Sequence, residues 1–158
     1  MTIQSLEPVF LEATAKLLKE AILESPHYSP LAKTEEIAAL TGEKLVMQNV
    51  FIAVEDKTLL GVLVSSTAEA GLLWLSWVVV SPQARGRGIA KDLITAFHAS
   101  AAAQGVHKTW CDSRLANTAS ARMLEKSGYR VVATLYKHWY GLDYLIWERL
   151  ILDTLTLD

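Results

Sequence analysis

The stretch that most constrains the fold is residues 78–93, VVVSPQARGRGIAKDL, where an apolar strand pattern gives way to a helical one. The apolar run stops at Ser81-Pro82, and an amphipathic segment begins directly after Gly88. Glycine allows the backbone a left-handed turn and leaves no Cβ to hold a ligand away. The free amides and positive dipole end of a helix N-terminus attract anions. This stretch therefore predicts an α/β fold with an anion site between a strand and a helix.

The charges of this turn indicate what kind of anion it could hold. Arg85, Arg87 and Lys91 add positive charge, and no acidic residue lies between Ser81 and Asp92. Glycine, amides and fixed charge together predict a cradle for a pyrophosphate. The alternative is a tight turn whose arginines are only solvated.

Two common nucleotide-binding motifs fit this turn poorly. A P-loop requires Lys and Ser/Thr after its last glycine, but Ile89 follows Gly88. A dinucleotide-binding fingerprint requires a third small residue where Lys91 stands, and it normally opens the first βαβ unit of a domain. A nucleotide-binding domain is therefore the weaker interpretation.

Length and composition limit the classes of protein to which this chain could belong. The chain has 158 residues and a net charge of −2, which fits one domain and argues against a nucleic-acid binder that relies on global positive charge. Its one cysteine, Cys111, excludes an internal disulfide, and the N-terminus has no basic region followed by an apolar one, so we expect a cytoplasmic protein. The longest apolar run, GLLWLSWVVV, is about half the ~20 residues of a membrane span, and we expect no membrane partner.

Periodicity predicts a mixed α/β order along the chain. Helices are expected at 8–23, from Thr34 as a cap to Gly42, at 88–104 and at 117–128. Strands are expected near the N-terminus, at 49–56, 59–66, 72–80 and 106–112, and in a hairpin of 129–139 and 143–152. We therefore predict a single domain, 1–158, with a central mixed sheet of six to seven strands flanked by about four helices.

Two blocks of this sequence resemble the GNAT superfamily of N-acetyltransferases. Residues 83–88, Gln-Ala-Arg-Gly-Arg-Gly, match the Gln/Arg-x-x-Gly-x-Gly/Ala hallmark between the fourth strand and the third helix of that family. Residues 117–129, NTASARMLEKSGY, resemble its Asn-x-x-Ala/Ser-x-x-x-x-Glu-Lys-x-Gly-Phe/Tyr helix. The order of elements is similar over nearly the whole chain. The resemblance implies acetyl-CoA as co-substrate.

The resemblance also implies roles for individual residues. The amide of Val78 would stabilise the oxyanion of the transition state, and Asn117 would contact the pantetheine arm, although a plain helix N-cap explains an Asn there equally well. The full set expected to bind the coenzyme is Val78, Val79, Val80, Gln83, Arg85, Gly86, Arg87, Gly88, Ile89, Ala90 and Asn117.

The sequence departs from the family pattern at the acid and at the base. Many members carry a tyrosine acid where this chain has Leu124, but a ribosomal-protein N-terminal acetyltransferase branch also has leucine there and a serine earlier in the helix, as Ser120 is here. Ser120 is therefore the candidate proton donor. The fourth strand has Trp74 where a glutamate base often stands, so the base would be a water chain, or His27, Glu69 or His138.

The resemblance further implies that the acceptor site is formed by the first two helices, the loop between them and the last hairpin. Its candidate residues are His27, Tyr28, Trp74 and His138. The same aromatic hairpin could instead form a homodimer face. His98 and His107 lack ligand spacing, so we expect no metal, and Cys111 is expected to be a small buried residue.

The sequence thus predicts an acetyl-CoA-dependent N-acetyltransferase that acts on a primary amine of a small molecule or a peptide by direct attack. The alternative is a non-catalytic acyl-CoA-binding or sensing module, since both Leu124 and Trp74 depart from the catalytic pattern. We expect no nucleic-acid partner, because the basic cluster is short and has no aromatic platform.

Overall fold

The computed structural model describes residues 1–151 and has seven strands and five α-helices. The predicted end of the domain, 152–158, lies outside the described residues. The elements are β1 (Thr2–Ser5), η1 (Pro8–Phe10), α1 (Leu11–Glu24), α2 (Pro30–Ala39), α3 (Gly42–Val46), β2 (Asn49–Glu55), β3 (Thr58–Ser65), β4 (Leu72–Val80), η2 (Pro82–Ala84), α4 (Ile89–Ala103), β5 (Lys108–Arg114), α5 (Thr118–Lys126), β6 (Arg130–Leu135), η3 (Trp139–Gly141) and β7 (Tyr144–Leu150). The predicted mixed α/β fold and strand number are confirmed.

The region of α2 and α3 corrects the sequence prediction. The cap of α2 is Ser29, whose hydroxyl accepts from the Ala32 amide, whereas the Thr34 hydroxyl donates to the Pro30 carbonyl. Pro30 occupies the first turn of the helix, where its missing N–H costs nothing. Gly42 does not end a helix but begins α3, because Thr41 caps this further short helix. The described residues therefore form five α-helices, one more than the four expected from the sequence.

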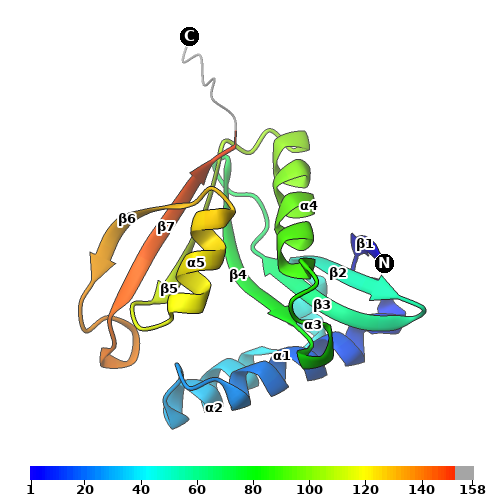
Figure 1. Cartoon of the computed structure of the whole chain (residues 1–158), viewed down its shortest axis with the longest axis horizontal. Coiled ribbons are helices and arrows are strands. Elements are labelled where there is room, and N and C mark those ends of the chain that lie inside the picture. The colour runs from blue at the N-terminus through cyan, green and yellow to red at the C-terminus, as the bar shows by residue number, and fades with distance from the viewer. Residues whose placement is uncertain (152–158) are drawn as a thin grey trace.

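The seven strands form one sheet in the order β1-β2-β3-β4-β5-β7-β6, with β4 in the middle. All neighbours are antiparallel except β4 and β5, which run parallel. These two strands pair only where Leu72–Trp74 of β4 lie beside Lys108–Trp110 of β5. Beyond Trp74 they diverge, so the sheet opens into two halves (Figure 1). The opening lies at the carboxyl ends of the two parallel strands, where ligands bind in open α/β sheets.

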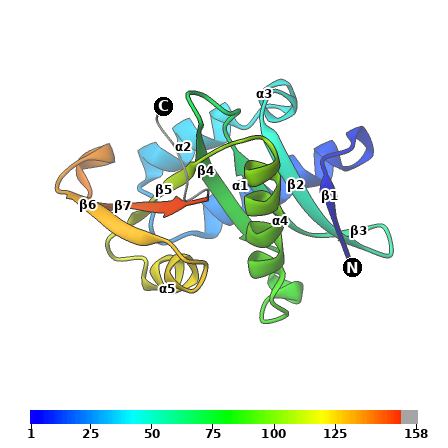
Figure 2. The ribbon, with the colours of Figure 1, turned by 90° about the horizontal axis from the view of Figure 1, so that it is seen from above.

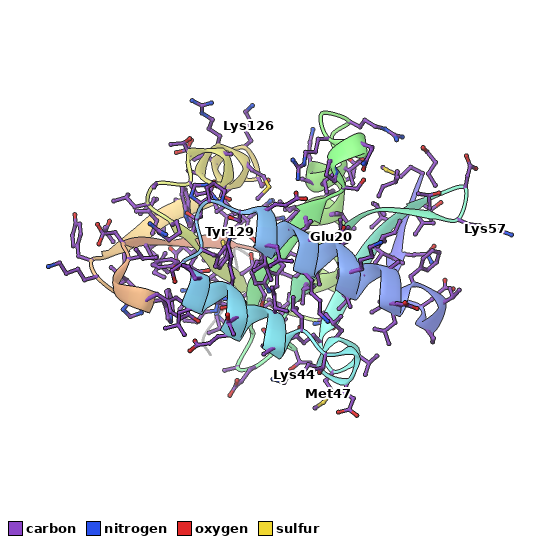
Figure 3. The ribbon with its side chains drawn as sticks, turned by 90° about the horizontal axis from the view of Figure 1, so that it is seen from below. Glu20, Lys44, Met47, Lys57, Lys126 and Tyr129 are labelled. Carbon is purple, nitrogen blue, oxygen red and sulfur yellow. The ribbon has the colours of Figure 1, made fainter. Side chains whose placement is uncertain are left out.

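Helices cover both faces of the sheet (Figure 2). On one face α1 and α3 pack over β2 and β3, around the fully buried Leu18 and Ile52. On the other face α4 and α5 pack over a core that contains Phe97 and Trp147. Figure 3, seen from below, shows α1 and α2 side by side on the near face, with Glu20 on α1. These helices give the open end of the sheet a wall. Within the described residues no helix is both long and apolar enough to cross a membrane.

Candidate functional site

The carboxyl half of β4 presents to the opening backbone groups that no neighbouring strand pairs with. The Ser81 amide donates to the Leu60 carbonyl at 2.8 Å, which makes these two residues a hydrogen-bonded pair of the β3–β4 ladder. Antiparallel ladders alternate, so the N–H and C=O groups of Val78 and Val80 point away from β3. On that side β5 has already departed. The edge of β4 therefore offers donors and acceptors that an extended ligand could pair with as a strand would.

The turn after β4 ends in a helix start with free amides. Gly86 and Gly88 both have φ 79°, a left-handed conformation that glycine adopts without strain. Gly88 is the N-cap of α4 and supplies no side chain, so the amides of the first turn keep no capping partner. A Cβ added at either glycine would meet nothing within 4 Å. The glycines are thus required by the turn and not by packing, and they leave the space above the amides open.

The two arginines of the turn differ in their partners. The Arg87 guanidinium contacts both carboxylate oxygens of Glu55, at 2.8 and 3.0 Å, and this hydrogen bonding lowers the pKa of Glu55. The exposed Arg85 donates from Nε to the Val80 carbonyl at 3.4 Å. Arg85 is therefore the arginine whose charge is less compensated by the protein.

The other residues of the turn contribute in different ways. Gln83 is exposed, Ala90 is half-buried, and Ile89 is buried in the core between the sheet and α4. The side chain of Ile89 thus holds the helix in place, and only its amide is directed to the turn.

A first cavity of about 230 Å³ lies in the opening between β4 and β5. It brings together Val78, Val79, Asn117 and Ser120, which the sequence predicted as site residues far apart in the chain. Asn117 is also the N-cap of α5, because its Oδ1 accepts from the Ser120 amide at 3.1 Å. Leu124 lines the same cavity.

A second cavity of about 340 Å³ adjoins the first and is largely aromatic. The two cavities share Tyr28, Ser76, Trp77, Asp112 and Tyr144 in their walls. Two ring contacts order these walls: Tyr28 stacks on Trp77 at 5.9 Å, and Trp139 meets Tyr144 edge-on at 5.0 Å. The complete lining is Tyr28, Glu36, Trp74, Ser76, Trp77, Asp112, Trp139, Tyr140 and Tyr144.

Two carboxylates in the second cavity have raised pKa values. Burial raises the pKa of Asp112 from 3.8 to about 6, and nearby Glu36 acts in the same direction, while a backbone hydrogen bond and His138 oppose the increase. Burial and the neighbouring Glu35 raise the pKa of Glu36. A carboxylate that titrates near neutral pH is a good proton acceptor. Asp112 therefore has the chemistry of a general base.

Sequence reasoning missed both carboxylates. Asp112 follows Cys111 on β5, whose alternation puts Thr109, Cys111 and Ser113 on the buried face and Asp112 on the opposite one. That alternation was readable, but the divergence of β4 that exposes this face to a cavity was not. Glu36 stands in an acidic run of α2 that reads as solvated surface.

Two tyrosines line the wall between the cavities and remain protonated. Burial and the charge of Asp112 raise the pKa of Tyr144, which is 7% exposed. Burial and Glu36 likewise raise the pKa of Tyr28. A protonated phenol is a hydrogen-bond donor, so this wall can supply protons as well as accept them.

The histidines and Glu69 lie differently from the aromatic candidates. Trp74 and Tyr28 line the second cavity, but the described linings of the two cavities include neither His27 nor His138. The His27 carbonyl accepts from Arg114 at 2.6 Å, and the exposed His138 packs edge-on against Trp139 at 4.2 Å. Glu69 pairs with Leu72 at the closed end of the sheet, where β4 begins. At this position β4 and β5 still pair, before they diverge beyond Trp74.

A buried polar chain supports the site from the side of α4. Arg149 donates to His98 Nδ1 at 2.7 Å, so the His98 Nε2 proton is directed to the Tyr129 hydroxyl at 2.9 Å. The Tyr129 hydroxyl lies 3.0 Å from Thr109 Oγ1 on β5. Burial, and then the charge of Arg149, lower the pKa of His98 to about 4. A neutral His98 thus ties α4 and the end of α5 to β5.

The remaining reactive side chains of the described residues offer neither a thiolate nor a metal site. Cys111 is buried beside the first cavity, and burial raises the pKa of its thiol, which keeps it protonated. Across the described residues, no three His, Cys, Asp or Glu side chains gather in a way that could hold a metal ion.

Comparison with known proteins agrees with this geometry. Residues 14–129 match the model of the Acetyltransferase (GNAT) family. This range includes both sequence blocks and the divergent ends of β4 and β5. No curated protein matches the chain significantly.

Solved structures share the fold at low sequence identity. YncA of Salmonella typhimurium, described as an acetyltransferase and solved with its cofactor acetyl-CoA, has a TM-score of 0.78 at 18% identity over 100% of this chain and 98% of its own. The ribosomal-protein-alanine N-acetyltransferase from Brucella melitensis has a TM-score of 0.76 at 19% identity, covering 95% and 99%. An aminoglycoside 6'-acetyltransferase type Ii has a TM-score of 0.78 at 19% identity, covering 98% and 99%.

Proposed function

The chain belongs to the GNAT acetyltransferase family, and from this premise we propose that it transfers an acetyl group from acetyl-CoA to a primary amine where its two cavities meet. The family membership makes the protein an N-acetyltransferase with acetyl-CoA as its co-substrate. The observation that carries the site assignment is the divergence of β4 from β5 into a cavity that shares a wall with a second, aromatic one.

In this proposal the coenzyme lies along the free edge of β4. The backbone groups of Val78 and Val80 pair with its pantetheine arm, and Asn117 approaches the arm from α5. The amides after Gly86 and Gly88 hold the pyrophosphate, with Arg85 adding charge at the surface. The free amide of Val78 then lies on the side of β4 where a thioester oxygen could accept its hydrogen bond.

The acceptor enters through the second cavity, and Asp112 takes its proton. Asp112 first takes a proton from the ammonium of the acceptor, and its pKa of about 6 suits this transfer near neutral pH. The neutral amine nitrogen then attacks the thioester carbonyl carbon, the carbon–sulfur bond breaks, and its electron pair leaves with sulfur. The second proton that the nitrogen loses balances the proton that the thiolate gains. This assignment replaces the bases considered from the sequence, because Asp112 lies in the wall that both cavities share.

The departing thiolate needs a proton, and two hydroxyls line the cavity in which it would form. Ser120 was the candidate from the sequence, and it lies in the first cavity beside Leu124, which occupies the usual acid position. Tyr144 lines the same cavity from β7 and is held protonated. We propose that Ser120 hydrogen-bonds the sulfur and that Tyr144 is the second donor.

The same residues argue against the sensing alternative. It rested on Leu124 and Trp74, which cannot exchange protons. Asp112 and Tyr144 supply a base and an acid from positions that the sequence pattern does not reveal. The acceptor class itself stays open at this level, since the named relatives act on a protein alanine and on an aminoglycoside.

The test is a panel of small amines and peptide N-termini incubated with acetyl-CoA, with free thiol and acetylated amine measured in the same samples. We expect the two products in equal amounts for at least one acceptor. Stabilisation of the protein by acetyl-CoA without any acetylated amine would support the sensing module instead.

A further inference from the structure

The walls of the second cavity have the properties of a cation site. Its aromatic rings come from separate parts of the chain, with Trp77 on β4, Tyr28 before α2, and Trp139 in η3. The Tyr28–Trp77 stack and the Trp139–Tyr144 edge contact order these rings around the cavity. The face of an aromatic ring attracts an ammonium group, and more strongly where water is excluded.

The cavity also holds one carboxylate more than the reaction uses. Asp112 is needed to take the proton of the reacting amine, whereas Glu36 on α2 takes no proton in that transfer. Among the described residues Glu36 makes no ion pair, and the charge that acts on it most is the like charge of Glu35. A half-buried carboxylate without a counterion is costly, and a ligand cation would remove that cost.

The nearby cations have other contacts and do not compensate the charge of Glu36. Arg114 donates to the His27 carbonyl and lies over the Tyr144 ring at 5.8 Å, and His138 acts on Asp112. None of these groups contributes to the pKa of Glu36. Glu35 is likewise engaged, because it accepts a hydrogen bond from the Tyr140 hydroxyl at 2.8 Å and so joins α2 to η3 at the rim.

Counting charges through the reaction then restricts the acceptor. A monoamine brings one positive charge, and it loses that charge when Asp112 takes its proton, so Glu36 is left uncompensated during attack. An acceptor with a second ammonium keeps one positive charge throughout. Building on the proposed function, we infer that the acceptor is an aliphatic diamine or polyamine whose second ammonium pairs with Glu36 between the aromatic rings.

The experiment compares putrescine with butylamine, which has the same carbon chain and one ammonium less, in wild type, Glu36→Gln and Glu35→Gln. For wild type we expect kcat/KM at least about tenfold higher for putrescine. Glu36→Gln should raise KM for putrescine by about tenfold with kcat little changed, and at a pH above the acidic limb it should change KM for butylamine far less. Glu35→Gln is the matched control and should keep the preference for the diamine.

Three outcomes would overturn the inference. These are equal kcat/KM for the two amines in wild type, an equal loss for both amines in Glu36→Gln, or better turnover of a peptide N-terminus than of putrescine and spermidine. Circular dichroism checks that the variants are folded. Trp74→Leu is a second variant, which should also weaken the binding of putrescine more than that of butylamine.

A binding measurement distinguishes failure of this inference from failure of the proposed function. Calorimetry with spermidine and desulfo-coenzyme A measures acceptor binding without turnover, and we expect Glu36→Gln to weaken it by about tenfold. If no amine is acetylated but spermidine binds through Glu36, the proposed function fails and the cation site stands. If amines are acetylated but spermidine binding does not depend on Glu36, the inference fails and the proposed function stands.

Discussion

Replacing Asp112 with asparagine should lower activity and raise stability at the same time. Without its base the enzyme should lose about 10²- to 10⁴-fold in kcat/KM, the usual contribution of a general base. The wild-type profile of kcat/KM against pH should fall below a pKa of about 6, because only the deprotonated carboxylate accepts the proton. This acidic limb should be absent from Asp112→Asn.

The stability effect follows from the same pKa. The pKa of Asp112 is higher in the folded protein than in the unfolded one, so the folded state binds the proton more tightly and stability falls as pH rises from 3.8 to about 6. Raising the pKa from 3.8 to about 6 corresponds to a cost of up to about 3 kcal/mol, fully present above pH 6. Removing the charge should recover much of it. Urea unfolding near pH 8 should therefore show Asp112→Asn as more stable than wild type, with the difference shrinking toward pH 4.

Glu36→Gln is the matched control for these measurements. It alters a carboxylate of the same cavity but keeps Asp112, so the acidic limb of the pH profile should persist. The limb should move to lower pH, because the charge of Glu36 contributes to the raised pKa of Asp112. A loss of less than about threefold in Asp112→Asn, or an acidic limb that survives the substitution, would refute Asp112 as the base.

The remaining predictions concern the cradle, the acid and the buried polar chain. Acetyl-CoA at a hundredfold excess over Kd should stabilise wild type by about 2.7 kcal/mol, and Gly88→Val should abolish this thermal shift, so an equal shift would contradict the cradle. Arg85→Gln should weaken coenzyme A binding more than Arg87→Gln in low-salt calorimetry, because Arg87 is already paired; the reverse order would count against that assignment. Ser120→Ala should lower kcat by roughly 10- to 100-fold at unchanged acetyl-CoA affinity, and a loss under about threefold would leave it no catalytic part. Tyr129→Phe should cost about 1 to 3 kcal/mol in urea unfolding, since two buried partners lose their hydrogen bond, and an unchanged midpoint would refute that network.

Much of the fold was predictable because local patterns and tertiary packing agree. The apolar run of β4, the hairpin turn at Asp56 and Lys57 with positive φ, and the glycines that end α4 and α5 all stand where periodicity and turn chemistry place them. The prediction failed at α2, where Ser29 competes with Thr34 for the cap and Pro30 fills the first turn.

The site was predictable where a motif fixes the backbone and unpredictable where topology decides. The turn with Gly86 and Gly88 follows from the residues that it contains. Asp112 and Tyr144, by contrast, line the cavity only because β4 leaves β5 after three paired residues, which no local pattern reveals. Candidate histidines were chosen for their chemistry alone, and His27 turns out to contribute its carbonyl to Arg114.

The central claim is that the opening between β4 and β5 holds the coenzyme. A crystal structure with acetyl-CoA tests it most directly. The account predicts the pantetheine arm along Val78 and Val80, the pyrophosphate at the amides that follow Gly86, and the thioester beside Asp112. Coenzyme bound elsewhere, for example in the cavity of about 280 Å³ between Leu6 and Leu45, with the opening empty, would contradict it.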